Sequence, residues 1–165
     1  MNAGGTLRLY GDFVRISGPF NAGAGSAVQL VGAFSQTIDP GDALQLSNLE
    51  INNSGGVVRV AKTLKASRNA TIHAGARLDL GSASIVLNGD AGIFTNNGTF
   101  DAAGAGIVLG GANTISGGTA IANAEIRAGS GSKFSSITID IGTGNNCTLK
   151  ASEAVLWSGS MTILS

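Results

Sequence analysis

Cysteine and proline are both scarce in this chain. It has one cysteine, Cys147, and two prolines among 165 residues. A single cysteine excludes an internal disulfide, so cysteine usage does not indicate the redox compartment. With so little proline, no proline-rich linker divides the chain, and we expect a single domain.

Charge is also low and evenly balanced. Charged residues make up 12% of the chain, with 10 basic and 10 acidic side chains and a formal net charge of zero. An average soluble domain carries about 25% charged residues. No basic run is present, which argues against an electrostatic nucleic-acid interface. The surface must then be made of Ser, Thr, Asn, Gly and Ala, a composition typical of extracellular bacterial fibres.

Long apolar runs and aromatic side chains are missing too. No apolar stretch approaches the roughly 18 residues of a membrane span, so we expect none. The first five residues, Met1 to Gly5, have neither positive charge nor an apolar block, and predict no signal peptide. One Trp, one Tyr and six Phe give few platforms on which a sugar ring could stack.

The chain does contain short runs of alternating apolar and polar residues, each closed by Gly, Asn or Ser. Such runs predict half-buried β-strands, and helical periodicity is absent. Arg77 and Asp79 should face out, with Leu78 and Leu80 facing in. In the segment 70–74, Ala70, Ile72 and Ala74 should face in, with Thr71 and His73 facing out. The predicted strands are Thr6–Tyr10, Ala27–Val31, Ala43–Asn52, Val57–Ala61, Ala70–Ala74, Arg77–Leu80, Ser84–Asn88, Thr99–Ala102, Ile107–Leu109, Asn123–Ala128, Ser136–Ile141, Cys147–Ala151, Ala154–Trp157 and Met161–Leu164.

Several of these runs return later in the chain. Asn69–Ala74 resembles Asn146–Ala151 at an offset of 77, and Asn48–Ile51 resembles Asn123–Ile126 at an offset of 75. We interpret the chain as one domain, residues 1–165, made of two repeats of about 77 residues, 6–83 and 84–165. Residues at this offset should superpose, with Ile72 in the place of Leu149.

A long repeat of short strands without a linker predicts a solenoid rather than two sandwiches. We expect an all-β fold, a single-stranded right-handed parallel β-helix of about seven coils. At about 4.8 Å per coil, the stack would be about 35 Å long.

Three turn-rich segments of the chain also resemble a known class of proteins. Leu49–Gly56, Leu87–Asp90 and Asn96–Ala102 are similar to the β-strand repeats of large secreted bacterial surface proteins, the adhesin-like and autotransporter-passenger-like β-helices. The resemblance covers nearly the whole chain. It implies an extracellular structural or adhesive role and supplies no catalytic residue.

Few residues are candidates for chemistry. His73, the only histidine, corresponds to Lys150 at the offset of 77, and we interpret it as a solvated surface residue. The sequence around His73 offers no further ligands of the kind a metal site needs. It also contains no Gly-x-Ser-x-Gly turn, which many hydrolases have. Cys147 corresponds to Ala70 and is expected to be a small buried residue rather than a reactive thiol.

Charged residues on one outer face could still cleave a polysaccharide, as two carboxylates do in glycosidases. The candidates are Arg77, Asp79, Asp90 and Asp101. Asp90 follows a glycine, as Asp12 does, which favours a turn-capping role. We therefore predict no enzymatic activity, no catalytic residue, no metal site and no cofactor.

Asparagines and glycines fit turns better than ligand sites. Asn69 and Asn146 are expected in a turn or a stacked amide ladder. The pieces Ala22–Gly25 and Ala103–Gly106 precede strands rather than helices, so we interpret them as tight turns and not as a phosphate loop.

The predicted function is an extracellular or cell-surface structural protein, a segment of a microbial fibre, stalk or adhesin. Its partners would be other copies stacked head to tail, flanking repeats of a longer chain, or surface glycans, with no nucleic acid. A carbohydrate-binding or polysaccharide-cleaving β-helix is the alternative. An ice-binding solenoid would need regular Thr-x-Thr rows, which are absent. The predicted assembly interface consists of Leu7, Leu9, Tyr10, Trp157, Ile163 and Leu164.

Overall fold

The structure is a computed structural model in which the N-terminal coils are described in most detail. Side chains are described as far as Phe100, and only backbone strands beyond it. The described residues are 4–16, 20, 22–41, 44–87, 93–101, 106–109, 114–118, 121–122, 125–128, 133–140, 148–151 and 156–164.

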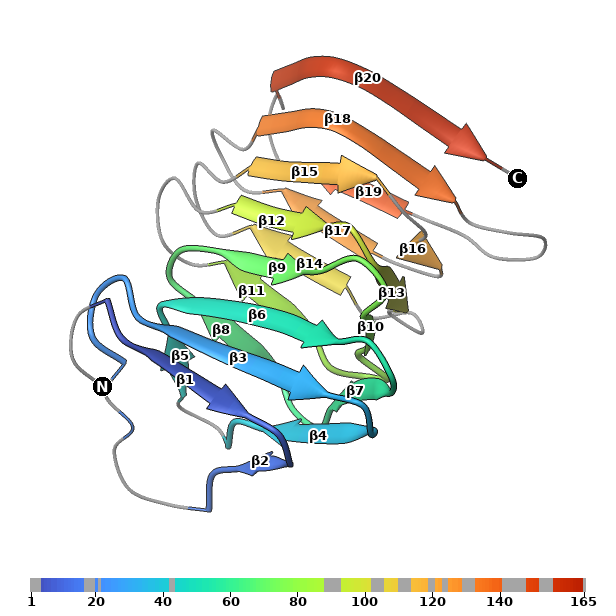
Figure 1. The fold of residues 1–165 in the computed structure, drawn as a ribbon. Helices are drawn as coiled ribbons and strands as arrows, with labels where there is room; N and C mark the ends of the chain where they lie inside the picture. The colour runs from blue at the N-terminus through green and yellow to red at the C-terminus, as the bar shows by residue number, and fades with distance from the viewer. Residues whose placement is uncertain are drawn as a thin grey trace.

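Three parallel sheets form the sides of a coil that climbs from the N-terminus to the C-terminus and winds to the right (Figure 1). Sheet A consists of β1 (Thr6–Leu9), β3 (Ala27–Gly32), β6 (Asn48–Asn53), β9 (Ala70–Ile72), β12 (Ile93–Asn96), β15 (Thr114–Gly118), β18 (Lys133–Asp140) and β20 (Leu156–Leu164). Sheet B consists of β2 (Phe13–Val14), β4 (Gln36–Asp39), β7 (Val57–Val60), β10 (Arg77–Asp79), β13 (Thr99–Asp101) and β16 (Ile121–Ala122). Sheet C consists of β5 (Gln45–Leu46), β8 (Leu64–Ala66), β11 (Ile85–Leu87), β14 (Gly106–Leu109), β17 (Glu125–Ala128) and β19 (Thr148–Ala151).

The predicted β-solenoid is confirmed. Neighbouring strands of each sheet belong to successive coils and pair in parallel. The number of coils differs slightly from the predicted seven, because sheet A has eight strands and sheets B and C have six each. The part of the chain that the structure describes contains no helix, and so none that could cross a membrane.

The repeat of the structure is one coil, and the expected superposition at an offset of 77 is wrong. Gln29 lies opposite Glu50, 21 residues further along. Ile72 belongs to sheet A, whereas Leu149 belongs to sheet C and pairs with Ile126. All three sides use the same local pattern of inward apolar and outward polar residues. Segments from different sides therefore resemble one another in sequence.

Inward side chains stack in rows along the coil axis. Leu30, Ile51 and Ile72 form one row of sheet A, and each is at most 1% exposed. On sheet B, Val58, Leu78 and Phe100 are in register and fully buried. Burying one such side chain contributes about 1.5–3 kcal/mol, so each row stabilises the contact between successive coils.

The predicted alternation is confirmed where strands continue and wrong where the chain turns. Leu78 and Leu80 are buried while Arg77 is exposed. Ala70 and Ile72 are also buried, but Ala74 is exposed because β9 ends at Ile72.

A buried polar network forms the corner between sheets A and B. Asn53 Nδ2 donates to Phe34 O at 2.6 Å and to Gln36 Oε1 at 2.7 Å. Its Oδ1 accepts from Gly56 N at 2.9 Å. Gln36 Nε2 donates in turn to carbonyls of the preceding coil, including Leu9 O at 3.0 Å. The network satisfies buried groups and links three coils.

The corner between sheets B and C is built from Asp-x-Gly turns. Asp39 Oδ1 accepts from Gly41 N at 3.0 Å, and Asp79 Oδ1 accepts from Gly81 N at 2.9 Å. Both glycines have positive φ, 63° and 53°, which other residues rarely adopt. These turns fix where sheet C begins in each of the two coils.

Candidate assembly surfaces and polar sites

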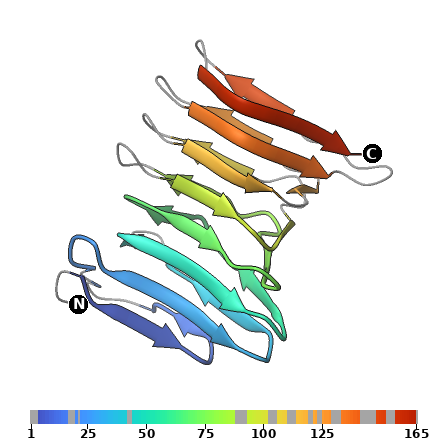
Figure 2. The same cartoon turned by 45° about the horizontal axis from the view of Figure 1, so that its top comes forward.

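The outermost strands of sheet A are β1 and β20, at opposite ends of the stack (Figures 1 and 2). Each pairs on one side only among the described strands, whereas every inner strand of the sheet pairs on both. An edge strand leaves backbone N–H and C=O groups available to a further strand. Both ends of sheet A can therefore accept another parallel strand in the same register.

The N-terminal half of the predicted interface lies on or next to the β1 edge. Leu7 and Leu9 are half-buried, in register with the fully buried Val28 and Leu30 of β3. They continue the inward rows of sheet A. Tyr10, in the turn after β1, is 73% exposed. The three residues thus form an apolar end to the described stack.

The C-terminal half of the predicted interface lies in β20. In backbone register, Trp157 pairs with Phe134, and Ile163 and Leu164 pair with the last two residues of β18, Ile139 and Asp140. All three predicted residues are therefore on the other edge strand. Their side chains lie outside the described part of the structure.

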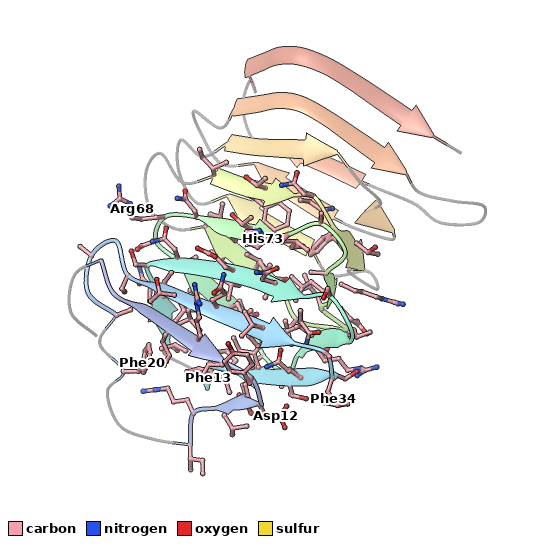
Figure 3. The ribbon with its side chains drawn as sticks, viewed as in Figure 1. Asp12, Phe13, Phe20, Phe34, Arg68 and His73 are labelled. Atoms are coloured by element: carbon pink, nitrogen blue, oxygen red, sulfur yellow. The ribbon has the colours of Figure 1, made fainter. Side chains whose placement is uncertain are left out.

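Three more apolar side chains are exposed near the N-terminal end and were not predicted. Val14 is 57%, Phe34 83% and Ile16 91% exposed. Val14 and Ile16 lie on β2 or just after it, at the edge of sheet B, and Phe34 lies in the turn after β3 (Figure 3). Alternation around Phe13 and Val14 was the available sequence signal, but a two-residue strand is too short to recognise by alternation.

Next to these residues, Phe13 and Phe20 stack edge to face, with ring centroids 5.6 Å apart. Both rings are half-buried and pack against the core. Edge-to-face pairs are a favourable aromatic geometry. The pair covers part of the core near the N-terminal end, whereas Val14 and Ile16 are exposed.

His73 faces out, as predicted, but is not a fully solvated residue. Its side chain is 38% exposed and its Nε2 lies 3.4 Å from Glu50 Oε2. The two atoms are close enough for an ion pair, but they do not form a hydrogen bond. Nε2 is buried and has no hydrogen-bond partner. Glu50 Oε2 instead accepts from Gln29 Nε2 at 2.8 Å. His73 is therefore a neighbour of a surface polar pair that spans two coils.

The charged residues considered for glycosidic cleavage are only partly brought together. Asp79 Oδ2 lies 4.0 Å from Arg59 Nε, and Asp79 also caps the turn at Gly81. Asp101 is in backbone register with Asp79, with its side chain outside the described part. Arg77 is exposed on the same strand.

The remaining predicted residues are Asp90, Asn146, Cys147 and Asp12. Asp90, Cys147 and Asn146 lie outside the described residues. Asp12 does not cap its own turn; its Oδ1 accepts from Thr37 N of the next coil at 2.7 Å. This hydrogen bond connects the residue before the edge strand β2 with strand β4.

Asparagine side chains link successive coils at the start of sheet A strands. Asn69 N donates to Asn48 Oδ1 at 3.3 Å, and Ile93 N donates to Asn69 Oδ1 at 3.1 Å. Asn48 Nδ2 donates to Ser26 O at 2.9 Å. Each of these bonds joins an asparagine side chain to a backbone group, so none is the stacked amide ladder predicted for Asn69.

No cluster of three or more His, Cys, Asp or Glu side chains within the described residues could hold a metal ion. Searches of protein-family models, curated protein sequences and solved structures find no match to this chain. The functional argument therefore depends on the fold and on the surfaces described above.

Proposed function

We propose that this chain is a β-solenoid segment of an extracellular microbial fibre, stalk or adhesin, and that copies stack head to tail. The observation that carries the proposal is the eight-stranded parallel sheet A, whose two outermost described strands, β1 and β20, each have an open edge. A strand of a neighbouring copy would continue the sheet in the same direction.

The apolar N-terminal end supports this proposal. Leu7 and Leu9 are less buried than the residues they align with on β3, Val28 and Leu30. One further coil on β1 would cover both, and burial of apolar surface is worth about 25 cal/mol per Å². Tyr10 and Ile16 add exposed apolar surface at the same end.

Parallel geometry also determines the type of assembly. A strand added to β1 must come from the opposite end of a second copy if all strands run in the same direction. Such a contact is heterologous, and heterologous contacts that do not close by rotation produce filaments. A further coil of a longer polypeptide would satisfy the same edge covalently.

The extracellular assignment depends on composition and resemblance. Only 12% of the residues are charged, and the turns are rich in Gly, Asn, Ser and Thr. The same turn phrases resemble those of secreted bacterial surface proteins. A passive scaffold of this kind needs no reactive group, only coils that pack on one another.

The experiment is light scattering of the purified chain over a concentration series, followed by negative-stain microscopy. Head-to-tail stacking predicts a mass that rises with concentration and filaments of uniform width. A monomer that persists at high concentration would reject self-stacking.

One observation favours the second candidate, a carbohydrate-binding β-helix. A groove on the side of the coil contains two lysines and two hydroxyl side chains. The described residues that line it include Lys62, Thr63, Lys65 and Ser82.

A further inference from the structure

Exposed large apolar side chains gather on the first two coils. Of the five that the structure describes, Tyr10, Val14, Ile16 and Phe34 lie there, and only Ile93 lies elsewhere. Tyr10, Val14 and Phe34 are 73%, 57% and 83% exposed, and we call these three the apolar corner patch. Ile16 is left out of the patch because it borders residues 17–19, which lie outside the described residues.

The patch faces sideways from the coil. Leu9 and Phe13 pack against the core, and Tyr10 and Val14 directly follow them in the alternating sequence. Val14 is in register with Asp39, an outward position of sheet B. Phe34 lies in the turn after β3, at the corner between sheets A and B (Figure 3). Stacking on β1 extends the inward rows of sheet A and therefore does not account for apolar side chains on the outer face.

The next coil leaves the side chain of Phe34 open and holds its backbone in place. A Cβ on Gly56 would lie 2.3 Å from Phe34 C, so the residue packed there has no side chain that could cover the ring. Asn53 Nδ2 donates to Phe34 O at 2.6 Å, and Ser35 Oγ accepts from Val57 N at 3.3 Å. An exposed aromatic side chain on a fixed backbone loses little freedom on binding.

Two opposite charges flank Tyr10. Arg8 lies two residues before it and Asp12 two residues after it, and both side chains are exposed. Asp12 Oδ1 accepts from Thr37 N at 2.7 Å, which fixes this carboxylate at the corner. A two-fold axis beside Tyr10 would bring Arg8 of one copy opposite Asp12 of the other, twice in the same contact. The segment is therefore complementary to itself, as a contact between two identical surfaces requires.

The exposed area matches what a small dimer contact needs. An aromatic side chain presents about 150–250 Å², so Tyr10 and Phe34 together expose roughly 250–400 Å². With Val14 and the polar rim, two such surfaces would bury about 1,000 Å², which is enough for a weak but specific interface. The chain has a formal net charge of zero, so two copies do not repel each other strongly.

We propose that two copies of this chain associate side by side through the apolar corner patch, about a two-fold axis parallel to the coil axis. Rotation about this axis reverses the chain direction across the contact, which pairs Arg8 with Asp12. A two-fold axis along the strands would instead place Arg8 opposite Arg8. The proposed axis also keeps both solenoids pointing the same way, so side-by-side pairing is compatible with head-to-tail stacking.

A lipid surface is the other occupant that exposed aromatic side chains suit. Anionic lipids attract surfaces with clustered basic residues. Here the charges of Arg8 and Asp12 cancel, so the patch offers anionic lipid no net attraction. The charges that weaken the case for a membrane are the ones that favour a second copy.

The test is sedimentation equilibrium of the full chain carrying Leu7→Lys, which blocks stacking through β1. We expect its mass to rise with concentration and to level off at two copies, because a two-fold contact closes. Adding Tyr10→Ser and Phe34→Ser should weaken the dimer by about tenfold or more, since aromatic side chains dominate such contacts. The control is Ile93→Ser, which removes an exposed apolar side chain outside the patch and should leave the dimer unchanged.

The symmetry of the contact has its own variant. Arg8→Glu would place two carboxylates opposite each other, twice, and should weaken the dimer several-fold. Arg68→Glu makes the same change in net charge at the exposed corner between sheets C and A (Figure 3) and should have no effect. All of these side chains except Leu7 are exposed, and circular dichroism checks that each variant keeps its β-structure.

The proposal is overturned if the Leu7→Lys chain stays a monomer or exceeds two copies, if the two serine substitutions leave association unchanged, or if Arg8→Glu and Arg68→Glu behave alike. Flotation with vesicles of phosphatidylcholine and phosphatidylserine provides a further check. Vesicle binding that Phe34→Ser abolishes would assign the patch to a lipid surface instead. Stacking is judged separately, by whether Leu7→Lys lowers the mass that the parent chain reaches.

Discussion

At the scale of single residues, Gly55 and Gly56 lie against the backbone of the preceding coil. A Cβ on Gly55 would lie 2.6 Å from both Cα and O of Ala33, and one on Gly56 would collide with the backbone of Phe34. Real Cβ atoms are not found this close to backbone atoms. The corner between sheets A and B is therefore restricted to glycine at these positions by space alone.

Gly55→Ala should accordingly destabilise the protein by about 1–3 kcal/mol, the usual cost of overpacking. Gly11→Ala is the control, since a Cβ there has no neighbour within 4 Å. The free energy of unfolding in urea measures both. Equal stability of the two variants would show that the corner can relax, and that the contact at Gly55 is not limiting.

Asn53 is the second residue on which this corner depends. It is fully buried and makes hydrogen bonds with Phe34 O, Gln36 Oε1 and Gly56 N. Asn53→Ala leaves several buried groups without partners, each worth about 1–3 kcal/mol. We expect a clear loss of thermal stability, measured by the temperature at which the circular dichroism signal is lost. Asn52→Ala, on the exposed side of the same strand, should have little effect.

At the scale of elements, the strands that were recognised from the sequence place apolar residues inward. The inward positions of Leu78 and Leu80 were predicted for this reason, and both residues are buried. This pattern was not sufficient by itself, because β8 was missed although its inward residues are Leu64 and Ala66. Strands β4 and β12 were missed because each places a polar side chain inward. Gln36 is 2% exposed and Asn96 3% exposed, positions that an alternation rule assigns to apolar residues.

The coil period was missed for a related reason. Successive coils share a pattern rather than identical residues, so the likeness at an offset of 77 was easier to recognise than the coil period, which is 21 residues between Gln29 and Glu50. The groove at Lys65 was unpredictable without that period. It depends on which corners lie next to one another, whereas the edge residues Leu7 and Leu9 needed only local alternation.

The inward rows predict what a buried charge would do. Ile72 is 1% exposed and lies between Ile51 of the coil before and Asn96 of the coil after. Ile72→Asp would bury an unpaired carboxylate, which costs several kcal/mol. We expect loss of the β-signal in circular dichroism. The control is Thr71→Asp, on the outward side of the same strand, which should remain folded.

At the scale of the whole molecule, the solenoid differs between its flank and its two ends. The flank carries paired strands, polar ladders and the lysine groove. The ends carry the open edges of β1 and β20. In a solenoid each coil contacts only its neighbours, so an added copy would extend the stack without altering the coils already present. Growth at the ends would therefore leave the flank unchanged.

The last prediction tests the N-terminal junction. Leu7 lies on the inward face of β1, in register with Val28, whereas Thr6 is exposed on the other face of the same strand. In an assembled filament Leu7 would be covered by the next copy, so Leu7→Lys would bury an ammonium group at the junction. Thr6→Lys adds the same charge on the side that stays in solvent.

We expect the Leu7→Lys chain to reach a mass of no more than two copies in light scattering at concentrations where the parent chain and Thr6→Lys grow further. Its circular dichroism spectrum should match that of the parent, since Leu7 is at an edge and half-buried. Ile163→Lys on β20 tests the opposite edge in the same assay. Filaments that persist in both edge variants would mean that copies join along the flank, through a surface other than the open edges of sheet A.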